Sequence, residues 1–497
     1  MVFKKRNTWL EYLLIYLVLY SMAFIRHYQT DTYAALMSNG SFGHDQGQLL
    51  MGRYGCYVVH AFLDVILGVL NIGYYEIFYF CTLLIIVSIA IVSCIIEKKI
   101  VNVTGQGSSI GIRLCILLIF ANVFFQSWFD FWECAPQWSG ALLCIGAAIW
   151  LFDSKNNWKR NSLCLLLLIS SLTFYQGTIA LFLIIGLFLI FLGNKGVLNK
   201  ESLLSSIYCV LMTGIACVIS YVIVRLTPYL IGITNSSERA GSIGIVDIIN
   251  NVFKVIEYIE DILVDTYEML PKYFLLFFVG VLIVVLFINC WNQGKRINTY
   301  LYIFLLLSCS LMSAFIPHFV ATKTYIPPRS ITMFWAWVSI LALLALTNVH
   351  KKALEWVIIG TMFILLISNV FVINRIFSET IATNKMDQEI AYSIQNEIEK
   401  YEETNKTTVD TICTYFDEEP TSEYDFVRYE GYDINRRMYS TLWSLVPGIN
   451  FYNNTSYMGC TGTPEDYTKW FNDKEWDYFM PEEQLRFEDN VLHLAVY

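Results

Sequence analysis

The chain has 497 residues, of which 56% are hydrophobic and only 15% are charged, and its formal net charge is −9 at pH 7. Soluble domains carry roughly 25% charged residues, and a soluble core stops growing at roughly 250–300 residues. One compact soluble core is therefore excluded, and the acid excess gives no indication of nucleic-acid binding. The apolar residues come in runs of about 17–24 positions, the length that crosses a hydrocarbon layer about 30 Å thick.

These apolar runs predict a polytopic α-helical membrane protein. The first run follows Lys4, Lys5 and Arg6 and lacks a signal-peptidase site, so we interpret it as an uncleaved signal anchor. The bundle is expected over residues 1–374, and a small C-terminal α/β domain over residues 375–497. About eleven transmembrane helices are predicted, at Trp9–Ile25, Glu76–Ile96, Leu114–Phe129, Gln137–Phe152, Ser162–Phe174, Thr178–Leu192, Leu203–Val224, Tyr273–Trp291, Tyr300–Ile316, Ile331–Thr347 and Leu354–Ile373.

The connections between these runs predict the orientation. With a cytoplasmic N-terminus, the inner connections are short and basic, which agrees with the positive-inside rule. The long polar segments Arg26–Tyr75, Thr227–Lys272 and Asn374–Tyr497 are then extracytoplasmic, and the second of them predicts an amphipathic helix at Asp247–Glu268 with a solvated acidic face. The basic residues of the inner connections are Lys98, Lys99, Arg113, Lys155, Lys159, Arg160, Lys195, Lys200, Lys295, Arg296, Lys351 and Lys352.

Several function classes are disfavoured by what the sequence lacks. The middles of the runs carry almost no ionisable residues, which argues against an ion-coupled transporter or proton pump. The sequence has no C-x-x-C pair, glycine-rich phosphate loop, dinucleotide fingerprint or G-x-S-x-G elbow. No cofactor or metal ligand is therefore predicted, and a requirement for a divalent metal is left open.

The first outer segment gathers ionisable residues directly after the first span. Asp31, Asp45 and Arg53 lie here. A carboxylate at this position could act as a general base, a second one could contact substrate, and an arginine could bind a phosphate through two hydrogen bonds. Both aspartates are also good helix caps, so a solvated loop is the alternative. The stretch His60–Tyr75 predicts an amphipathic helix in the outer interface.

A second acidic and aromatic cluster follows the third span. Asp130, Glu133 and Trp138 lie in a connection too short to leave the membrane surface. The tryptophan could belong to the interfacial aromatic belt or contact substrate. The belt does not account for the two carboxylates, for which a catalytic and a structural role remain equally open.

Two further outer junctions are candidate substrate contacts. Tyr175 and Gln176 precede Gly177 and predict a tight polar hairpin between two spans. Lys323 and Arg329 flank a Pro-Pro pair, and a rigid turn that holds Arg329 would suit a phosphate clamp. A plain loop anchored to lipid headgroups is the alternative for this second junction.

The C-terminal segment predicts a small mixed domain. A charged helix at about 377–403 precedes strand-like runs at Val409–Phe416 and Val491–Val496. Aromatic residues are dense between the two strands, which suits stacking on sugar rings, although aromatics also build small cores. Cys413 and Cys460 could form a disulfide if this segment faces an oxidising space.

The chain resembles the Gtr-type glucosyltransferases that modify bacterial O-antigens and related surface glycans, a family in the GT-C class of polytopic glycosyltransferases. The first span followed by Thr30-Asp31-Thr32-Tyr33, then Gly52-Arg53, Tyr175-Gln176 and Arg329-Ser330 at the starts of later segments, carries this resemblance, together with the polar tail. Many members have two adjacent acids where this chain has Asp31 followed by Thr32, so the resemblance implies no pair of acids.

The resemblance implies a GT-C-like enzyme of the bacterial cytoplasmic membrane that glucosylates a surface glycan. Because nucleotide sugars are absent outside the cytoplasm, an outward-facing site would take its sugar from a polyprenyl phosphate whose tail lies in the bilayer. Asp31 would then be the base on the acceptor hydroxyl, with Glu133 or Asp130 as alternatives. Arg53 or Arg329 would hold the departing phosphate.

Two rival classes remain. An O-antigen polymerase or ligase also has many spans and large outer loops, but its outer loops are expected to be richer in arginine than in acids. A flippase for lipid-linked glycans needs a hydrophilic cavity through the bundle, against which the uncharged spans argue.

Overall fold

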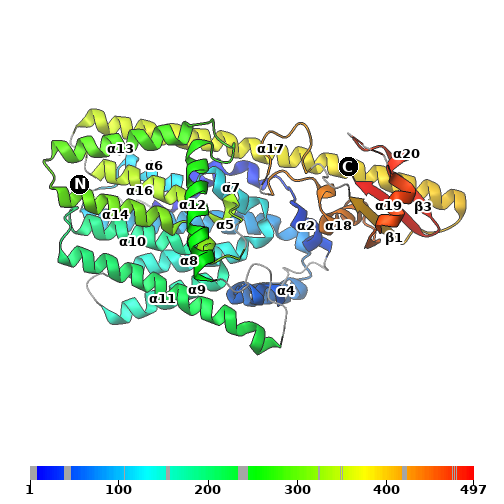
Figure 1. Ribbon diagram of the computed structural model, residues 1–497, viewed down its shortest axis with the longest axis horizontal. Helices are drawn as coiled ribbons and strands as arrows, with labels where there is room; N and C mark the ends of the chain where they lie inside the picture. The colour runs from blue at the N-terminus through cyan, green and yellow to red at the C-terminus, as the bar shows by residue number, and fades with distance from the viewer. Residues whose placement is uncertain are drawn as a thin grey trace. The chain divides into compact units, whose positions relative to one another are not determined.

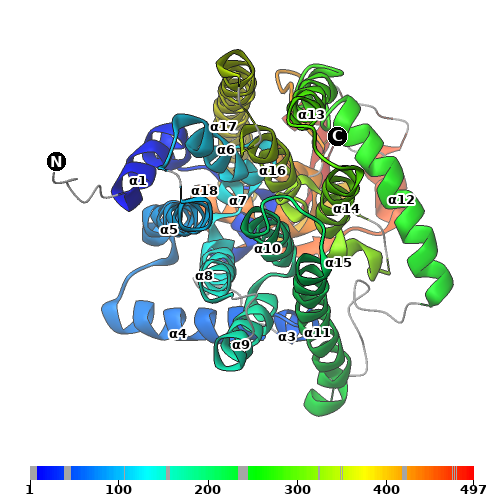
Figure 2. The same ribbon diagram turned by 90° about the vertical axis from the view of Figure 1, so that its left-hand side faces the viewer.

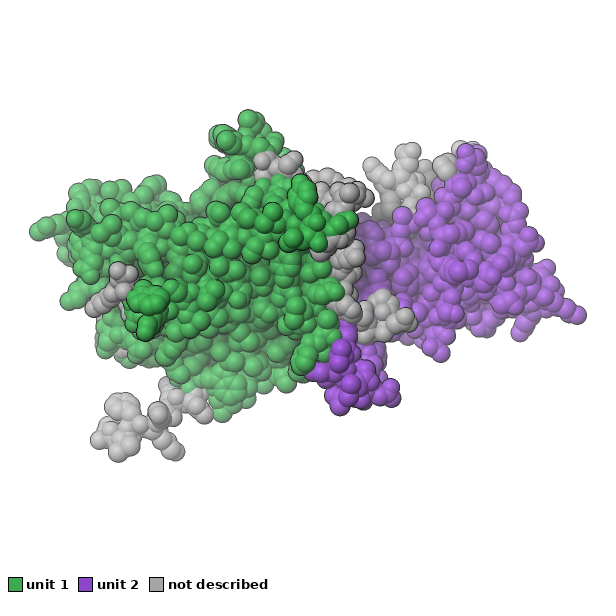
Figure 3. Space-filling model, turned by 90° about the horizontal axis from the view of Figure 1, so that it is seen from below, with its two compact units in different colours: residues 1–21, 44–63, 79–373 green, residues 22–43, 64–78, 374–497 purple. Residues whose placement is uncertain are grey.

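The computed structural model describes two compact units (Figure 3), unit 1 with residues 1–21, 44–63 and 79–373, and unit 2 with residues 22–43, 64–78 and 374–497. Both units are discontinuous in sequence, because the chain leaves the bundle twice near its N-terminus before it returns. The described residues are 8–37, 46–105, 107–152, 157–232, 244–322, 325–347, 349, 351–416, 422–431, 433–472, 474, 476 and 478–496.

Unit 1 is a bundle of helices built around α10 (Ile179–Gly193), which the other helices surround in Figure 2. Every residue of α10 from Ile179 to Phe191 is buried, as expected for a helix that is apolar on all sides. Most of the surrounding helices run side by side, and α12 crosses them (Figure 1). They are α1 (Thr8–Leu19), α3 (Gln46–Leu50), α4 (Tyr54–Leu70, of which 54–63 belong here), α5 (Phe78–Thr104), α6 (Ile110–Phe120), α7 (Val123–Asp130), α8 (Ala135–Leu151), α9 (Trp158–Phe174), α11 (Lys200–Ile231), α12 (Ile245–Val264), α13 (Phe274–Asn292), α14 (Ile297–Ser313), α15 (Ile316–Phe319), α16 (Phe334–Thr347) and the first part of α17 (Lys352–Asn405).

Six described helices are long and apolar enough to cross a membrane, and the number is seven if the bent pair α6 and α7 forms one span. The chain is thus a largely helical protein with six or seven candidate spans, and the prediction of eleven is not confirmed. The third predicted span, Leu114–Phe129, is bent, because it covers parts of α6 and α7, which meet at 47°. The last predicted span and the charged helix after it are one continuous helix, α17. The amphipathic helix predicted at Asp247–Glu268 is present as α12, and its outer position stays a prediction.

Unit 2 contains a four-stranded sheet with strand order β2-β1-β4-β3. The strands are β1 (Thr411–Phe416), β2 (Met458–Thr461), β3 (Leu485–Glu488) and β4 (Val491–Val496). Strand β1 is parallel to both β2 and β4, whereas β3 pairs antiparallel with β4. Both strands predicted from the sequence are therefore confirmed, and β2 and β3 lie at the edges of the sheet. The unit also holds α2 (Thr30–Met37), α18 (Leu442–Asn453), α19 (Pro464–Phe471) and α20 (Pro481–Gln484).

The core of unit 2 joins segments that are far apart in sequence. Ile394 and Ile398 from the polar second half of α17 pack in one buried cluster with Ile412 of β1 and Tyr33 of α2. The side chain of Asn384 bonds the backbone of Tyr28 in both directions, accepting at 2.8 Å and donating at 2.9 Å. These hydrogen bonds fix the segment that leads into α2.

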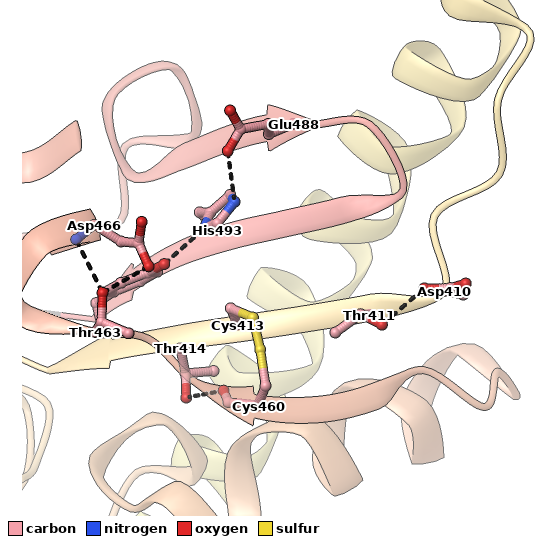
Figure 4. Close-up of a disulfide and its surroundings, with 10 residues drawn as sticks. Asp410, Thr411, Cys413, Thr414, Cys460, Thr463, Asp466, Glu488 and His493 are labelled. Carbon is pink, nitrogen blue, oxygen red and sulfur yellow. Dashed lines mark hydrogen bonds and ion pairs between the residues drawn. A yellow bond between two sulfur atoms is a disulfide. The ribbon is translucent and has the colours of Figure 1, made fainter. Parts of the chain in front are cut away.

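A disulfide joins Cys413 and Cys460, which are direct partners in the β1–β2 register with 4.5 Å between their Cα atoms (Figure 4). The pairing that the sequence allowed is thus present. On the other side of β1, His493 of β4 shares a hydrogen bond of 2.5 Å with the Tyr415 hydroxyl, and Glu488 lies 3.8 Å from its Nε2 atom. The disulfide on the β2 side of β1 and the hydrogen bond on its β4 side hold the small sheet together.

Candidate functional site

The bend between α6 and α7 places a buried acid at the end of a short helix. Asn122 makes the break, since its side-chain oxygen accepts from two backbone N–H groups that start α7 at 3.1 and 3.0 Å. Helix α7 then ends at Asp130, whose Oδ1 accepts from Gln126 Nε2 at 2.6 Å, and both side chains are completely buried. One turn later, Glu133 is also buried, in the 3-10 turn Trp132–Cys134.

Arg329 lies next to this acid on the short turn Pro328–Ser330. Its guanidinium group is 4.9 Å from the centroid of the Phe131 ring, and its positive charge acts on the Asp130 carboxyl group. Its backbone oxygen accepts from Trp128 Nε1 at 3.0 Å and from the Tyr175 hydroxyl at 3.2 Å. The main chain at Arg329 is therefore held by two aromatic side chains, while the residue as a whole stays partly exposed.

The neighbouring Ser330 brings no second charge to the site. Its Oγ atom shares a hydrogen bond of 2.9 Å with His318 Nε2. Burial lowers the pKa of His318 to about 4, so this imidazole is neutral at pH 7. Arg329 is thus the cation that this turn contributes.

Three packed aromatic side chains, Trp128, Trp138 and Tyr175, lie beside Arg329. The rings of Trp128 and Trp138 stack with their centroids 5.0 Å apart, and Tyr175 meets both edge-on. The Arg53 guanidinium lies over the Tyr175 ring, 5.8 Å from its centroid. Indole and phenol faces of this kind suit both cations and sugar rings.

The turn before Arg53 requires a glycine. Gly52 has a φ of +76°, and a Cβ atom there would collide with Val224. Gln176 ties the same turn to the predicted hairpin, because its Nε2 donates to the Met51 backbone oxygen at 3.0 Å. The positions of Arg53 and of the Tyr175-Gln176 pair are thereby coupled.

The structure brings together most of the predicted site residues of unit 1. Direct contacts and charges join the side chains that we call the Arg329 cluster: Arg53, Gln126, Trp128, Asp130, Trp138, Tyr175 and Arg329. Gln176 supports this cluster, and Glu133 follows it on the next turn. Asp31 belongs to unit 2, while Asp45 and Lys323 lie outside the described residues.

Several polar atoms in and beside the Arg329 cluster keep unused hydrogen-bonding capacity. Within the described part of the chain, Gln126 Oε1, Arg53 Nε, Trp138 Nε1 and Ser139 Oγ are buried and have no hydrogen-bond partner. Buried polar atoms are paired in the large majority of cases. A group of orphaned donors and acceptors beside an arginine is therefore typical of a site that binds a polar ligand.

Asp31 lies in the first turn of α2 and is exposed. Its Oδ1 atom accepts a hydrogen bond of 2.9 Å from Trp443 Nε1 at the start of α18. A carboxylate held in this way by one donor keeps acceptor capacity for a substrate hydroxyl.

The sequence interpretation missed Gln126 and Trp128, because both fell inside a run taken as one straight span. The available signal was Asn122, a helix-capping residue in the middle of that run. Trp443 was noted only as one of many aromatics in the tail. Among the described residues, no group of three or more His, Cys, Asp or Glu side chains could hold a metal ion.

An apolar helical bundle with an arginine, acids and aromatics gathered at one place fits the class of membrane glycosyltransferases. A family model described as "Glucosyl transferase GtrII" matches residues 20–346, which include Asp31 and the whole Arg329 cluster. The chain belongs to this glucosyltransferase family, as its resemblance indicated, and is a glycosyltransferase that uses a sugar donor and an acceptor. Searches of curated proteins and of solved structures gave no significant match.

Proposed function

We propose that the enzyme transfers a hexosyl residue, specifically glucosyl, from a polyprenyl-phosphate sugar to a cell-surface glycan on the outer side of the membrane. The observation that carries this proposal is the partly exposed Arg329, whose charge acts on Asp130 and which lies beside the Trp128, Trp138 and Tyr175 rings. An arginine of this kind suits a phosphate that gains charge as the sugar leaves. A lipid-linked donor fits because the chain has no nucleotide-binding signature.

In the proposed reaction, the acceptor hydroxyl oxygen bonds to C1 of the donor sugar while the bond from C1 to the phosphate oxygen breaks. The hydroxyl proton passes to a carboxylate, for which Asp31 is the first candidate and Glu133 and Asp130 are the alternatives. The electron pair of the broken bond leaves with the phosphate, whose charge Arg329 and Arg53 stabilise. We assign Lys323 to the same phosphate group, and Asp45, Tyr175, Gln176 and Trp138 to substrate contacts.

The distribution of cysteines supports an outward-facing unit 2. Its only two cysteines, Cys413 and Cys460, are bonded, whereas the eleven of unit 1 are free. Disulfides persist in oxidising spaces outside the cytoplasm. We therefore keep the proposed topology: a multi-pass protein of the bacterial cytoplasmic membrane with an N-terminus inside and a C-terminal domain, residues 375–497, outside. The shorter helices α1, α9, α14 and α16 would complete the eleven spans.

The test uses the purified full-length protein in lipid nanodiscs with a panel of polyprenyl-phosphate hexoses and acceptor glycan. Release of free polyprenyl phosphate that depends on acceptor is expected, and the glucosyl donor should give the highest rate. Absence of release with every donor would contradict the proposal and would favour a polymerase, ligase or flippase.

The same assay identifies the base. Asp31→Asn should reduce turnover by about 10²–10⁴-fold, the usual contribution of a general base, while expression and membrane insertion stay normal. Glu133→Gln and Asp130→Asn are the matched variants, and the amide with the largest loss of turnover marks the base. Normal turnover in Asp31→Asn would remove this residue from the mechanism.

A further inference from the structure

Unit 2 contains a cleft of about 460 Å³ between α18 and the edge strand β2. Its position at the edge of the sheet leaves one side open, and α18 forms the opposite wall. The described residues that line it are Met37, Thr414, Leu442, Trp443, Val446, Pro447, Asn450, Ser456, Tyr457, Gly459, Cys460 and Thr461.

The lining chemistry suits a neutral, hydroxyl-rich ring. None of the described residues that line the cleft is charged, which disfavours phosphates and acidic sugars. Trp443 is 53% exposed, a large value for an indole, and so offers a face for stacking. The exposed hydroxyls of Ser456 and Thr461 can exchange hydrogen bonds with a ligand. An aromatic face combined with neutral hydrogen-bonding groups is the chemistry that recognises a pyranose.

The walls of the cleft are fixed before any ligand binds. Asn450 accepts from the Tyr457 N–H at 2.9 Å and donates to the Tyr457 backbone oxygen at 2.9 Å, which ties α18 to the loop before β2. The disulfide anchors Cys460 to β1, and Thr414 donates to the Cys460 oxygen at 3.3 Å (Figure 4). A rigid cleft avoids part of the entropy that binding would otherwise cost.

One residue connects this cleft with the proposed chemistry. Trp443 lines the cleft and donates its N–H to Asp31 at 2.9 Å. Met37, at the other end of α2, lines the cleft as well. A ring stacked on Trp443 therefore lies within reach of the Asp31 carboxylate.

We propose that the cleft between α18 and β2 binds a neutral pyranose residue of the acceptor glycan and presents one of its hydroxyls to Asp31. This inference rests on the proposed glycosyl transfer. All lining residues except Met37 lie beyond the region matched by the family model. The cleft therefore belongs to the part of the chain that the family does not define, which is where selection of a particular acceptor is expected.

Binding can be tested separately from transfer on the full-length protein in nanodiscs. Saturation-transfer NMR with the methyl glycosides of glucose, galactose and rhamnose should show contact with the protein, and Trp443→Ala or Ser456→Trp should remove it. Ser456→Trp fills the cleft without touching Asp31. An unfolding temperature equal to that of the parent protein would show that both variants fold. Tyr478→Ala is the control, since Tyr478 is an exposed aromatic of the same unit outside the cleft.

In the transfer assay, Trp443→Ala and Ser456→Trp should raise the KM for acceptor by about 2–12-fold, the loss expected for one ring-stacking contact. Tyr478→Ala should leave it unchanged. Unchanged glycoside contact in both cleft variants would overturn the inference even if transfer occurs. It would also be overturned if the cleft bound an extended peptide along β2 and no glycoside. Glycoside contact without transfer from any donor would instead contradict the proposed function alone.

Discussion

Each unit contains a buried aspartate beside an arginine that lies over an aromatic ring. In unit 1 the pair is Asp130 and Arg329, with the guanidinium 4.9 Å from the ring centroid. In unit 2 the pair is Asp387 and Arg437, with a corresponding distance of 4.8 Å. The charged residue types and the distances from guanidinium to ring match, so we look for a difference in role in the surroundings.

The surroundings differ in burial and in hydrogen bonding. Arg437 is only 1% exposed, and Asp387 accepts from the Tyr424 hydroxyl at 2.9 Å and from the Met438 N–H at 3.0 Å. Arg329 is partly exposed, so its guanidinium can be reached from outside the protein. The comparison teaches that an enclosed pair whose aspartate is held by two donors stabilises a fold, whereas a pair with an accessible arginine can bind a ligand.

The largest effect is expected for Arg437→Ala. The charge of Arg437 acts on the buried Asp387 carboxyl group, and removal of one of two buried opposite charges costs about 3–5 kcal/mol of folding free energy. Unit 2 should therefore unfold at a much lower temperature. The control is Arg436→Ala, because Arg436 pairs with Asp433 at 3.1 Å in a partly exposed bridge that contributes only about 0–1 kcal/mol. Equal thermal stability of the two variants would erase the distinction between the units.

Arg329→Gln should act on catalysis and leave stability nearly unchanged. Loss of a preorganised group that stabilises developing charge lowers turnover by about 10²–10³-fold. Arg225→Gln is the matched control, since Arg225 also lies over an aromatic ring, 5.2 Å from the Tyr221 centroid, outside the Arg329 cluster. If polyprenyl-phosphate release fell equally in both variants, Arg329 would have no special role.

The smallest effect is a pH dependence of the stability of unit 2. Asp387 lies in the polar part of α17, and burial raises its pKa from 3.8 to about 7. Because the folded state holds the proton more tightly, the stability due to Asp387 is fully present below about pH 4 and is lost as the pH rises through about 7. Asp387→Asn should flatten this dependence. Thermal unfolding of both proteins between pH 5 and pH 8 measures the effect, and parallel curves would contradict it.

Local sequence patterns predicted much of the fold. Short strand-like runs predicted β1 and β4, and the acidic amphipathic pattern predicted α12, because in each case neighbouring residues determine the element. The bend in the third predicted span was missed, since hydropathy averages over a single polar residue and Asn122 caps the start of α7. Strand β2 was missed because its edge position leaves it short and largely exposed.

For the candidate site too, some features could be predicted from the sequence and others could not. Asp130, Arg329 and Tyr175 could be selected from sequence because each lies in a short junction between apolar runs, where polar residues have few structural reasons to occur. Their mutual contacts could not be predicted, since these depend on how the helices pack. The bond between Asp31 and Trp443 spans 412 positions, and no local pattern carries that information.

The discontinuity of unit 2 has a consequence for the order in which the protein matures. Tyr28 leaves the ribosome 356 residues ahead of Asn384, its hydrogen-bond partner. At about 5–20 residues per second, that interval lasts on the order of 20–70 s. During this time, the residues around Asp31 lack the core that holds them, so the acid acquires its geometry only after the membrane helices have been synthesised. A truncated chain that lacks the C-terminal segment is therefore expected to contain the Arg329 cluster and still be inactive.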